Sequence, residues 1–367
     1  MKHVNLFLAA FIAVLMTGLV SCEKDNDVEN NYTTYQKAVD SQIQKDKKND
    51  KAILLVAFGS TWQQAFDAFD ATQAAYRSQF PNYDIYVSYS SAICINRAAA
   101  GENAADGAEI RKYYAPNFWL HGFGAAQYKE IVVQSLQVIP GEEFTRVINY
   151  IKDFANNYLG DLDDTYLQQV VLKLGAPLLT DVNTDVPAVA QALNTLYGTQ
   201  ANEGVVAFMG HGNPNSYDTY SANIRYAQLE NALQKLNPNY FVGTVDMPEN
   251  YKVQVLERMK AAGITDGKVY LHPLMSIAGD HAHNDMGGDD GEDMDSAEYE
   301  YNDEGEIEDL SWKCYFSQND YICDDETVIM KGLLELESIR NIWMQHTRDA
   351  VNGEALEDYY HSMFPEE

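Results

Sequence analysis

The sequence predicts an α/β fold of two similar lobes, each built on a doubly wound parallel sheet, with a cleft between them. Continuous apolar runs, such as residues 52–57, are typical of parallel strands that are buried on both faces. These runs alternate with stretches that carry apolar residues at helical spacing, which is the pattern of a doubly wound sheet. The pattern also starts twice, because "AILLVAFGS" at residues 52–60 is similar to "GVVAFMGHG" at residues 204–212.

The first lobe is expected at residues 51–180. Strands are predicted within residues 51–60, 83–91, 128–140 and 168–179, and helices within residues 62–80 and 141–159. The first of these helices is expected to end before Pro81, because proline lacks the backbone N–H that a helix interior needs.

The second lobe is expected at residues 181–335 and repeats the alternation. Its strands are predicted within residues 203–214, 240–252 and 267–279, and its helices within residues 185–198, 226–238 and 253–264. Residues 289–309 interrupt the pattern with twelve Asp or Glu and no Lys or Arg, which is typical of a solvated loop with loose affinity for cations. A last helix, at residues 337–351, is expected in a C-terminal segment and tail, residues 336–367.

Residues 1–21 are expected to be a lipoprotein signal peptide. The apolar run at residues 4–20 is short for a membrane span and is followed by a polar stretch. "LVSC" at residues 19–22 is similar to the bacterial lipobox, in which the signal is cut before a cysteine that is then lipidated; an ordinary signal peptide is the alternative. We therefore expect lipidation at Cys22 and a location in the cell envelope, lipid-anchored and either periplasmic or surface-exposed.

The segment between this signal and the first strand, residues 22–50, is polar and charged. It is expected to form a flexible tether with a short helix near residues 35–43. The membrane is therefore expected to be contacted through the lipid anchor only.

Charge and cysteine content narrow the classes of partner. The formal net charge of -30 argues against nucleic acid or an anionic membrane surface. The sequence contains no phosphate-binding loop, so no ATP is implied.

Cys314 and Cys323 are expected to form a disulfide, because they are near in sequence and the compartment is oxidising. The oligomeric state is not indicated.

Candidate metal ligands follow three strands of the second lobe. They are His211 in "FMGHGN", Asp246 in "GTVDMPEN" and His281 in "AGDHAHND". Ligands of open α/β sheets bind beyond the carboxyl ends of the strands, so these side chains are expected at the crevice between the lobes. Two imidazoles and a carboxylate suit Co(II), Ni(II), Fe(II) or Zn(II), whereas Mg(II) prefers oxygen alone. Three protein ligands leave positions open for an incoming ligand.

Each candidate also has a structural alternative. A single histidine after a strand is more often structural than metal-binding, and an aspartate at a strand end commonly caps the next helix. His283 shares one side with His281 only if the backbone between them is extended, and points elsewhere if the backbone turns.

Longer motifs in the same regions indicate a family. They are "ILLVAFGST" (53–61), "IVVQSLQVIPGEEF" (131–144), "LKLGAPLL" (172–179), "VVAFMGHG" (205–212), "HPLMSIAGDHAHNDMGGDD" (272–290) and "LSWK" (310–313). With these motifs, residues 51–350 resemble the anaerobic sirohydrochlorin cobaltochelatases of the CbiK type, which are class II chelatases related in fold to ferrochelatase. The resemblance implies that His211, Asp246 and His281 bind the metal.

The chain departs from this family at several positions. Asp246 stands where the family has glutamate, and Gln137 stands where relatives often have histidine. His283 replaces an apolar residue, and the acidic block at residues 289–309 is inserted between elements that are nearly adjacent in relatives. His121 lies in a further unusual segment. These differences concern the particular metal or substrate more than the fold.

The resemblance implies an ATP-independent chelatase that inserts Co(II), with Fe(II) or Ni(II) as alternatives, into sirohydrochlorin in anaerobic cobalamin biosynthesis. Insertion removes two pyrrole protons, and His211 is the candidate that takes one, with His281 as the second catalytic imidazole. Asp280 and Asp285 are candidates to orient an imidazole.

Two other functions are kept as alternatives. The chain would then be a non-catalytic envelope lipoprotein that binds haem or a corrinoid for uptake, or a metal-binding receptor without a tetrapyrrole. In the chelatase interpretation, basic residues must offset the repulsion between an acidic protein and a macrocycle that carries carboxylates. The candidates are Arg97, Arg111, Lys112 and Lys129.

Overall fold

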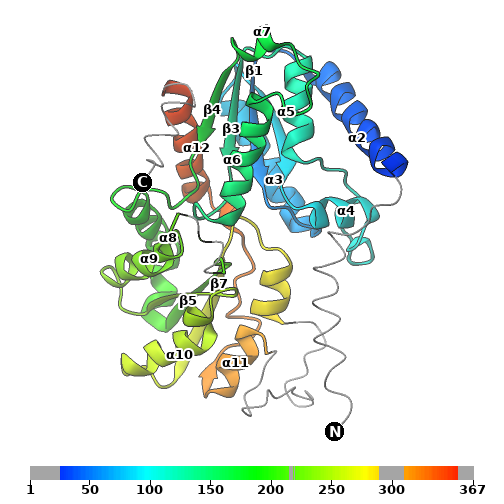
Figure 1. The fold of residues 1–367 in the computed structure, drawn as a ribbon. Helices are drawn as coiled ribbons and strands as arrows, with labels where there is room; N and C mark the ends of the chain where they lie inside the picture. Colours follow the sequence, from blue (N-terminus) through cyan, green and yellow to red (C-terminus); the bar gives the residue numbers. More distant parts are fainter. Residues whose placement is uncertain (1–24, 215–217, 219, 289–309, 354–367) are drawn as a thin grey trace.

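The computed structural model describes residues 25–214, 218, 220–288 and 310–353, with side chains from Thr33 onward (Figure 1). It contains two four-stranded sheets, whose strand orders are β2-β1-β3-β4 and β6-β5-β7-β8. All pairings are parallel. Both lobes therefore place their first strand inside the sheet, the second strand at one edge and the third on the other side. The predicted fold class is confirmed.

The predicted strands and helices are present with similar bounds, whereas the elements at residues 92–100, 116–125, 164–167, 312–318 and 321–322 were not predicted. The strands are β1 (Lys51–Ala57), β2 (Asp84–Tyr89), β3 (Glu130–Ser135), β4 (Val171–Gly175), β5 (Val205–Gly210), β6 (Tyr240–Thr244), β7 (Gly267–Leu274) and β8 (Tyr321–Ile322). The α-helices are α2 (Asp25–Asp46), α3 (Gln63–Gln79), α4 (Ala92–Ala100), α5 (Pro116–Ala125), α6 (Glu142–Ala155), α7 (Asp164–Leu167), α8 (Asp185–Glu203), α9 (Ile224–Gln234), α10 (Lys252–Ala261), α11 (Trp312–Gln318) and α12 (Glu337–Asn352). Shorter turns are η1 (Ala104–Asp106), η3 (Pro248–Asn250), η5 (Leu333–Glu335) and the π-helix η4 (His281–Gly287).

Within the described ranges, no helix combines the length and the apolar character that a membrane crossing requires. The expected signal peptide, Cys22 and the acidic block at residues 289–309 lie outside the described residues.

Helices cover both faces of the first sheet. Successive side chains of β1 point to opposite faces, so they pack in two different cores. Leu54 packs in one core with Trp119 of α5, and Leu55 packs in another core with Trp343 of α12. The second of these cores continues into the other lobe, where it includes Phe208 of β5. One shared apolar core therefore joins the lobes.

The C-terminal helix α12, expected in a segment of its own, packs against the first sheet although it follows the second (Figure 1). The indole Nε1 of Trp343 donates to the carbonyl of Gln137, and Thr347 donates to the side-chain oxygen of Gln134 at 2.7 Å. The chain thus returns to the first lobe at its end.

The segment expected as a flexible tether contains the helix α2, which packs on α5. Val39 and Ile43 are buried against Gly122, where a side chain larger than hydrogen would meet Ile43. Two apolar residues four positions apart form a narrow stripe on an otherwise polar helix. The short helix expected near residues 35–43 is therefore present within α2. The average composition of residues 22–50 hides the apolar stripe, so a flexible tether was predicted for the rest of this helix.

The expected disulfide between Cys314 and Cys323 is not formed, and this prediction was wrong. Both thiols are buried side chains, Cys314 on α11 and Cys323 just after β8. Burial raises the pKa of the Cys323 thiol to about 12, so the thiol stays protonated. Nearness in sequence does not fix the direction of two Cα–Cβ bonds, and a disulfide needs its Cβ atoms about 3.8 Å apart.

Candidate active site

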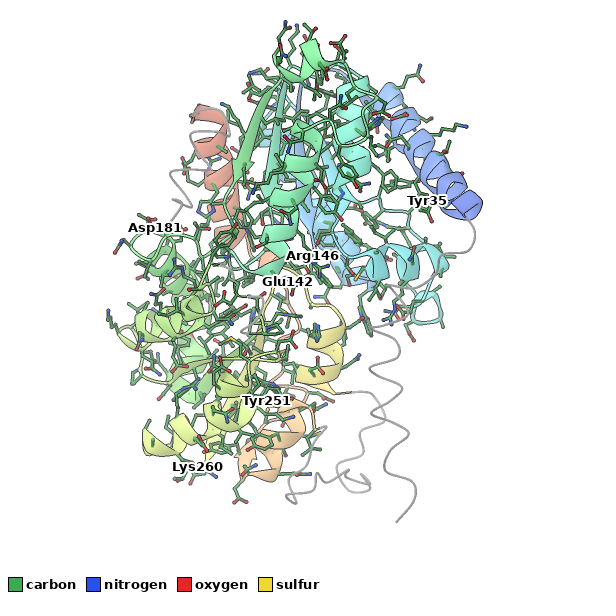
Figure 2. The ribbon with its side chains drawn as sticks, in the orientation of Figure 1. Tyr35, Glu142, Arg146, Asp181, Tyr251 and Lys260 are labelled. Carbon is green, nitrogen blue, oxygen red and sulfur yellow. The ribbon has the colours of Figure 1, made fainter. Side chains whose placement is uncertain are left out.

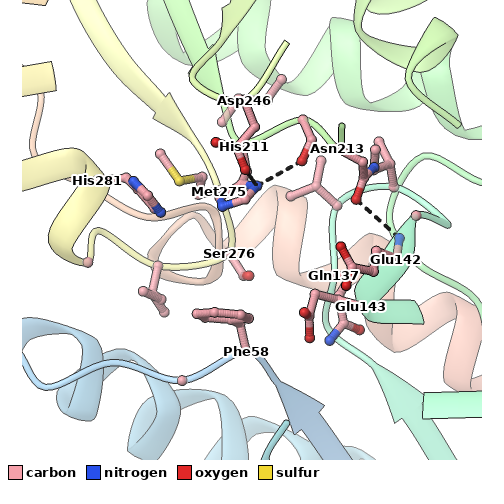
Figure 3. A pocket seen from close by; sticks show the side chains of 18 of the residues that line it. Phe58, Gln137, Glu142, Glu143, His211, Asn213, Asp246, Met275, Ser276 and His281 are labelled. Carbon is pink, nitrogen blue, oxygen red and sulfur yellow. Dashed lines mark hydrogen bonds and ion pairs between the residues drawn. The ribbon is translucent and has the colours of Figure 1, made fainter. Parts of the chain in front are cut away.

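A cavity of about 240 Å³ lies where the carboxyl ends of the two sheets face each other (Figure 3). Both sheets reverse their strand order here, between β1 and β3 and between β5 and β7, and such switch points are where open α/β sheets bind ligands. The first lobe contributes Phe58, Cys94, Gln137 and Glu143, and the second contributes His211, Asp246, Met275, Asp280 and His281, among others. The three predicted metal ligands therefore line one cavity.

His211 is placed by the turn that ends β5. Gly212 has a φ of +85°, a left-handed conformation that glycine adopts without strain, so the chain turns directly after the histidine. The Nδ1 atom of His211 lies 2.7 Å from the carbonyl oxygen of Gly212 and therefore donates to it. Nε2 is left with its lone pair, as a metal ligand requires.

Asp246 follows β6, and its backbone N–H donates to the carbonyl of His211 at 2.9 Å. Its Oδ2 atom lies 3.4 Å from Nδ1 of His211. The carboxylate therefore contacts the side of this imidazole that is already occupied by Gly212, and not the Nε2 side.

His281 is the first residue of the π-helix η4. Its Nδ1 atom lies 2.6 Å from Oδ2 of Asp285, one turn further along the helix. The carboxylate accepts a hydrogen bond from the Nδ1–H group and thereby orients the ring. The hydrogen bond with Asp285 raises the pKa of His281, against the opposing effect of burial. The rings of His281 and His211 meet edge to face with their centroids 4.8 Å apart.

Asp280, just before η4, and His283, within it, both contact Trp62 of the first lobe. The backbone turns at His281, so His283 leaves the cavity and stacks on Trp62 of the first lobe, with ring centroids 3.6 Å apart. Asp280 lines the cavity, but its carboxylate accepts from Nε1 of Trp62 at 2.6 Å and contacts no imidazole.

Across the described part of the chain, no group of three or more His, Cys, Asp or Glu is close enough to hold one metal ion in common. His211 and His281 are brought together, whereas Asp246 lies beyond Nδ1 of His211. The three-ligand set predicted from the sequence stays a proposal.

His121, an unusual residue of the first lobe, does not belong to this site. Its Nε2 atom pairs with Asp161 at 2.9 Å, and both residues line a separate cavity beside α5 and α6. His121 is therefore remote from the imidazoles of His211 and His281.

Comparison with known proteins identifies the family. The family model described as cobalt chelatase (CbiK) matches residues 51–352. The chain belongs to this family. The family and the chelatase class predicted from the sequence motifs are thereby confirmed.

Two relatives illustrate the family. This chain is 27% identical over 308 residues to the sirohydrochlorin cobaltochelatase CbiKC of Nitratidesulfovibrio vulgaris, covering 84% of this chain and 92% of the relative. It is 26% identical over 303 residues to the sirohydrochlorin cobaltochelatase of Salmonella typhimurium, covering 82% of this chain and 97% of the relative.

Solved structures agree with the fold of this chain. SirB from Bacillus subtilis with Fe3+ matches with a TM-score of 0.50 at 11% identity, covering 82% of this chain and 96% of SirB. SirB of Bacillus subtilis subspecies spizizenii in complex with cobalt matches with the same score at 13% identity. At this identity the likeness concerns the fold alone.

The sequence patterns did not indicate one acidic side chain of this site. Glu143, in the first turn of α6, lines the cavity and accepts a hydrogen bond from Ser90 Oγ at 2.9 Å. Burial raises the pKa of this carboxyl group. Acidic residues in a first helical turn are usually explained by the helix dipole, so only the strand exit just before it would have indicated a role at the site.

Proposed function

We propose that this protein is a sirohydrochlorin cobaltochelatase, which inserts Co(II) into the macrocycle without ATP. The observation that carries the proposal is the pair His211 and His281, which meet at the facing switch points with both Nδ1 atoms engaged and both Nε2 atoms left as ligands. Family membership and the two curated relatives support the choice of reaction.

The proposed reaction has two parts, the binding of the metal and the removal of the pyrrole protons. Co(II) is a substrate here, held by Nε2 of the two imidazoles. Asp246 is the proposed third ligand, which requires its carboxylate to turn from the Nδ1 side of His211 toward the metal. Metal insertion releases two pyrrole protons, and His211 and Glu143 are the proposed acceptors because both line the cavity. Nε2 of His211 can take a proton only after Co(II) has passed from it to the macrocycle, because its Nδ1 atom already carries a hydrogen. A cavity of about 240 Å³ is smaller than the ~300–1,000 Å³ usual for drug-sized ligands, so the macrocycle is held partly outside it or the lobes separate.

Among the described residues, few basic side chains lie near the cavity to pair with the carboxylates of the macrocycle. Arg97 lies 3.9 Å from Asp280 at the cavity wall, and Arg146 is next to Glu142 where α6 approaches the second lobe (Figure 2). Two of the basic residues singled out in the sequence are engaged elsewhere, because Arg111 pairs with Asp70 and Glu109, and Lys129 pairs with Asp50. Arg97 and Arg146 are also paired with acidic side chains, but their partners Asp280, Glu142 and Glu143 line the cavity, so these two arginines are the proposed partners of the substrate carboxylates.

The test is a spectroscopic insertion assay with the full chain in detergent, sirohydrochlorin and Co(II), without nucleotide. We expect the absorption spectrum of the cobalt product to appear, and its rate to fall at least about 100-fold in His211→Ala and His281→Ala. His121→Ala is the matched control, since His121 lies at a different cavity. Stoichiometric binding of haem or a corrinoid without insertion would instead support an uptake lipoprotein.

We further propose that the protein is a lipid-anchored envelope protein, attached through Cys22. The support is the sequence of residues 1–22, with its apolar run and lipobox-like end. Because α2 begins at Asp25, the folded domain would lie close to the membrane and not on a long tether. Cys22→Ser is expected to move the protein from the membrane to the soluble fraction, and equal membrane retention would refute the anchor.

A further inference from the structure

Trp62 of the first lobe contacts the second lobe on both sides of His281. Its indole Nε1 donates to Oδ1 of Asp280, the residue before His281, at 2.6 Å. Its ring plane stacks on His283, two residues after His281, with an interplanar angle of 5°. In Figure 1 the segment that follows β7 accordingly lies beside α3 and α4.

The segment that carries His281 is anchored on one face and uncapped at its start. Ala282 and Met286 of η4 are fully buried in the core of the second lobe. No side chain caps the N-terminus of this seven-residue π-helix, a rare conformation that is frequent at functional sites. Asp280 occupies the capping position, but its carboxylate is turned to Trp62 instead of the helix N–H groups. At the start of η4, next to His281, the contacts of Asp280 and His283 with Trp62 therefore take the place of a cap.

Trp62 is itself fixed in the first lobe. Its backbone N–H donates to Ser60 Oγ at 3.2 Å, and its carbonyl accepts from Phe66 in the first turn of α3. Next to it, Asn103 donates to Thr61 Oγ1 at 3.0 Å. The indole thus connects a hydrogen-bonded loop of one lobe to the uncapped start of η4 in the other.

We propose that Trp62 is a positioning residue, which holds His281 opposite His211 by binding Asp280 and His283 across the gap between the lobes. Asp285 sets the rotation of the His281 ring, and Trp62 sets the place of its backbone. The inference rests on the proposed function, in which His281 binds the metal.

The experiment separates the two contacts of the indole. Trp62→Phe keeps a ring that stacks on His283 but removes the N–H that binds Asp280. His283→Ala removes the stack, and His283→Phe restores an aromatic plane. Tyr158→Ala, at an exposed aromatic of the separate first-lobe cavity, is the control. For each full-length variant, the KM values for Co(II) and sirohydrochlorin are measured, and Co(II) affinity is measured by calorimetry without macrocycle.

Trp62→Phe and His283→Ala are each expected to raise the KM and the dissociation constant for Co(II) about tenfold, as the loss of an outer contact of a metal ligand does. The KM for sirohydrochlorin should change less than about twofold, and His283→Phe should regain wild-type values. A merely structural contact would lower the melting temperature and leave the Co(II) affinity unchanged, which overturns the proposal. An equal rise of both KM values also overturns it.

The outcome stays decidable if one variant fails to fold, because the His283→Ala and His283→Phe pair tests the stack alone. If the wild-type protein inserts no metal, the proposed function fails. The calorimetric comparison then still decides whether Trp62 supports metal binding by His281.

Discussion

At the scale of residues, the site is defined by which nitrogen of each imidazole is occupied. The Nδ1 atoms of His211 and His281 are hydrogen-bonded to a backbone carbonyl and to Asp285, respectively. Such partners fix the tautomer and make the other nitrogen a better ligand. For His281, this partner also affects the pH range in which the imidazole carries a free lone pair.

The pH dependence of metal binding tests the role of Asp285. Its hydrogen bond raises the pKa of His281, so the imidazole stays protonated to a higher pH than an ordinary histidine, for which the value is about 6.5. A protonated imidazole cannot bind Co(II), so metal binding is lost on acidification at a correspondingly higher pH. In Asp285→Asn the pKa of His281 falls, and the acidic limb of a plot of Co(II) affinity against pH is expected to move to lower pH.

Asp161→Asn is the control, because Asp161 also pairs with a histidine, the remote His121, through Nε2 of its ring. Coincident acidic limbs for wild type and Asp285→Asn would contradict the assignment of His281 as a ligand. Above the titration range, the loss of the charged partner should weaken Co(II) binding about tenfold.

Glu143 is expected to contribute to the rate and not to metal affinity. In Glu143→Gln the side chain keeps its size but no longer accepts a proton, so kcat should fall about 100-fold while the KM for Co(II) stays nearly constant. Ser90→Ala removes only the hydrogen bond to the carboxylate and should give a smaller loss. Steady-state insertion kinetics measure both values, and an unchanged kcat in Glu143→Gln would exclude it as a proton acceptor.

At the scale of elements, the lobes are completed by helices that the sequence order does not assign to them. α12 covers the first sheet although it comes last in the chain, and α2 packs on α5 although its composition resembles a linker. Each is held by a few buried apolar side chains, such as Trp343 on α12 and Ile43 on α2. Their docking is a property of the folded lobe.

Ile43→Ala tests whether α2 belongs to the folded unit. Ile43 is 1% exposed, so the change should lower the free energy of unfolding by about 2–3 kcal/mol through lost burial and a cavity. Gln44→Ala, at the exposed neighbour, should change it by less than about 0.5 kcal/mol. Urea denaturation measures both variants, and equal stabilities would mean that α2 is only a connection.

At the scale of the whole molecule, a strongly acidic chain has to bind a cation and an acidic macrocycle at one cleft. The formal net charge of -30 attracts metal ions at long range and repels carboxylates. Residues 289–309, outside the described ranges, follow the segment that carries His281, and we propose that they gather metal ions near the cleft.

Deleting residues 291–309 removes ten acidic residues and should raise the half-saturating Co(II) concentration about three- to tenfold at low salt. The difference should nearly vanish at about 1 M salt, where the Debye length is about 3 Å. A variant that keeps the length but replaces the acids with Asn and Gln separates charge from chain length. No change in either variant would refute the role.

The sequence by itself determined the parallel strands, their glycine-rich exits and the family, because these depend on local periodicity and on motifs within single segments. It also placed His211, Asp246 and His281 at strand ends, which the fold gathers at one edge. Only the tertiary structure decided which atoms face each other. Trp62 and Asp280 are 218 positions apart, and their hydrogen bond follows from the docking of two lobes, which no local pattern records.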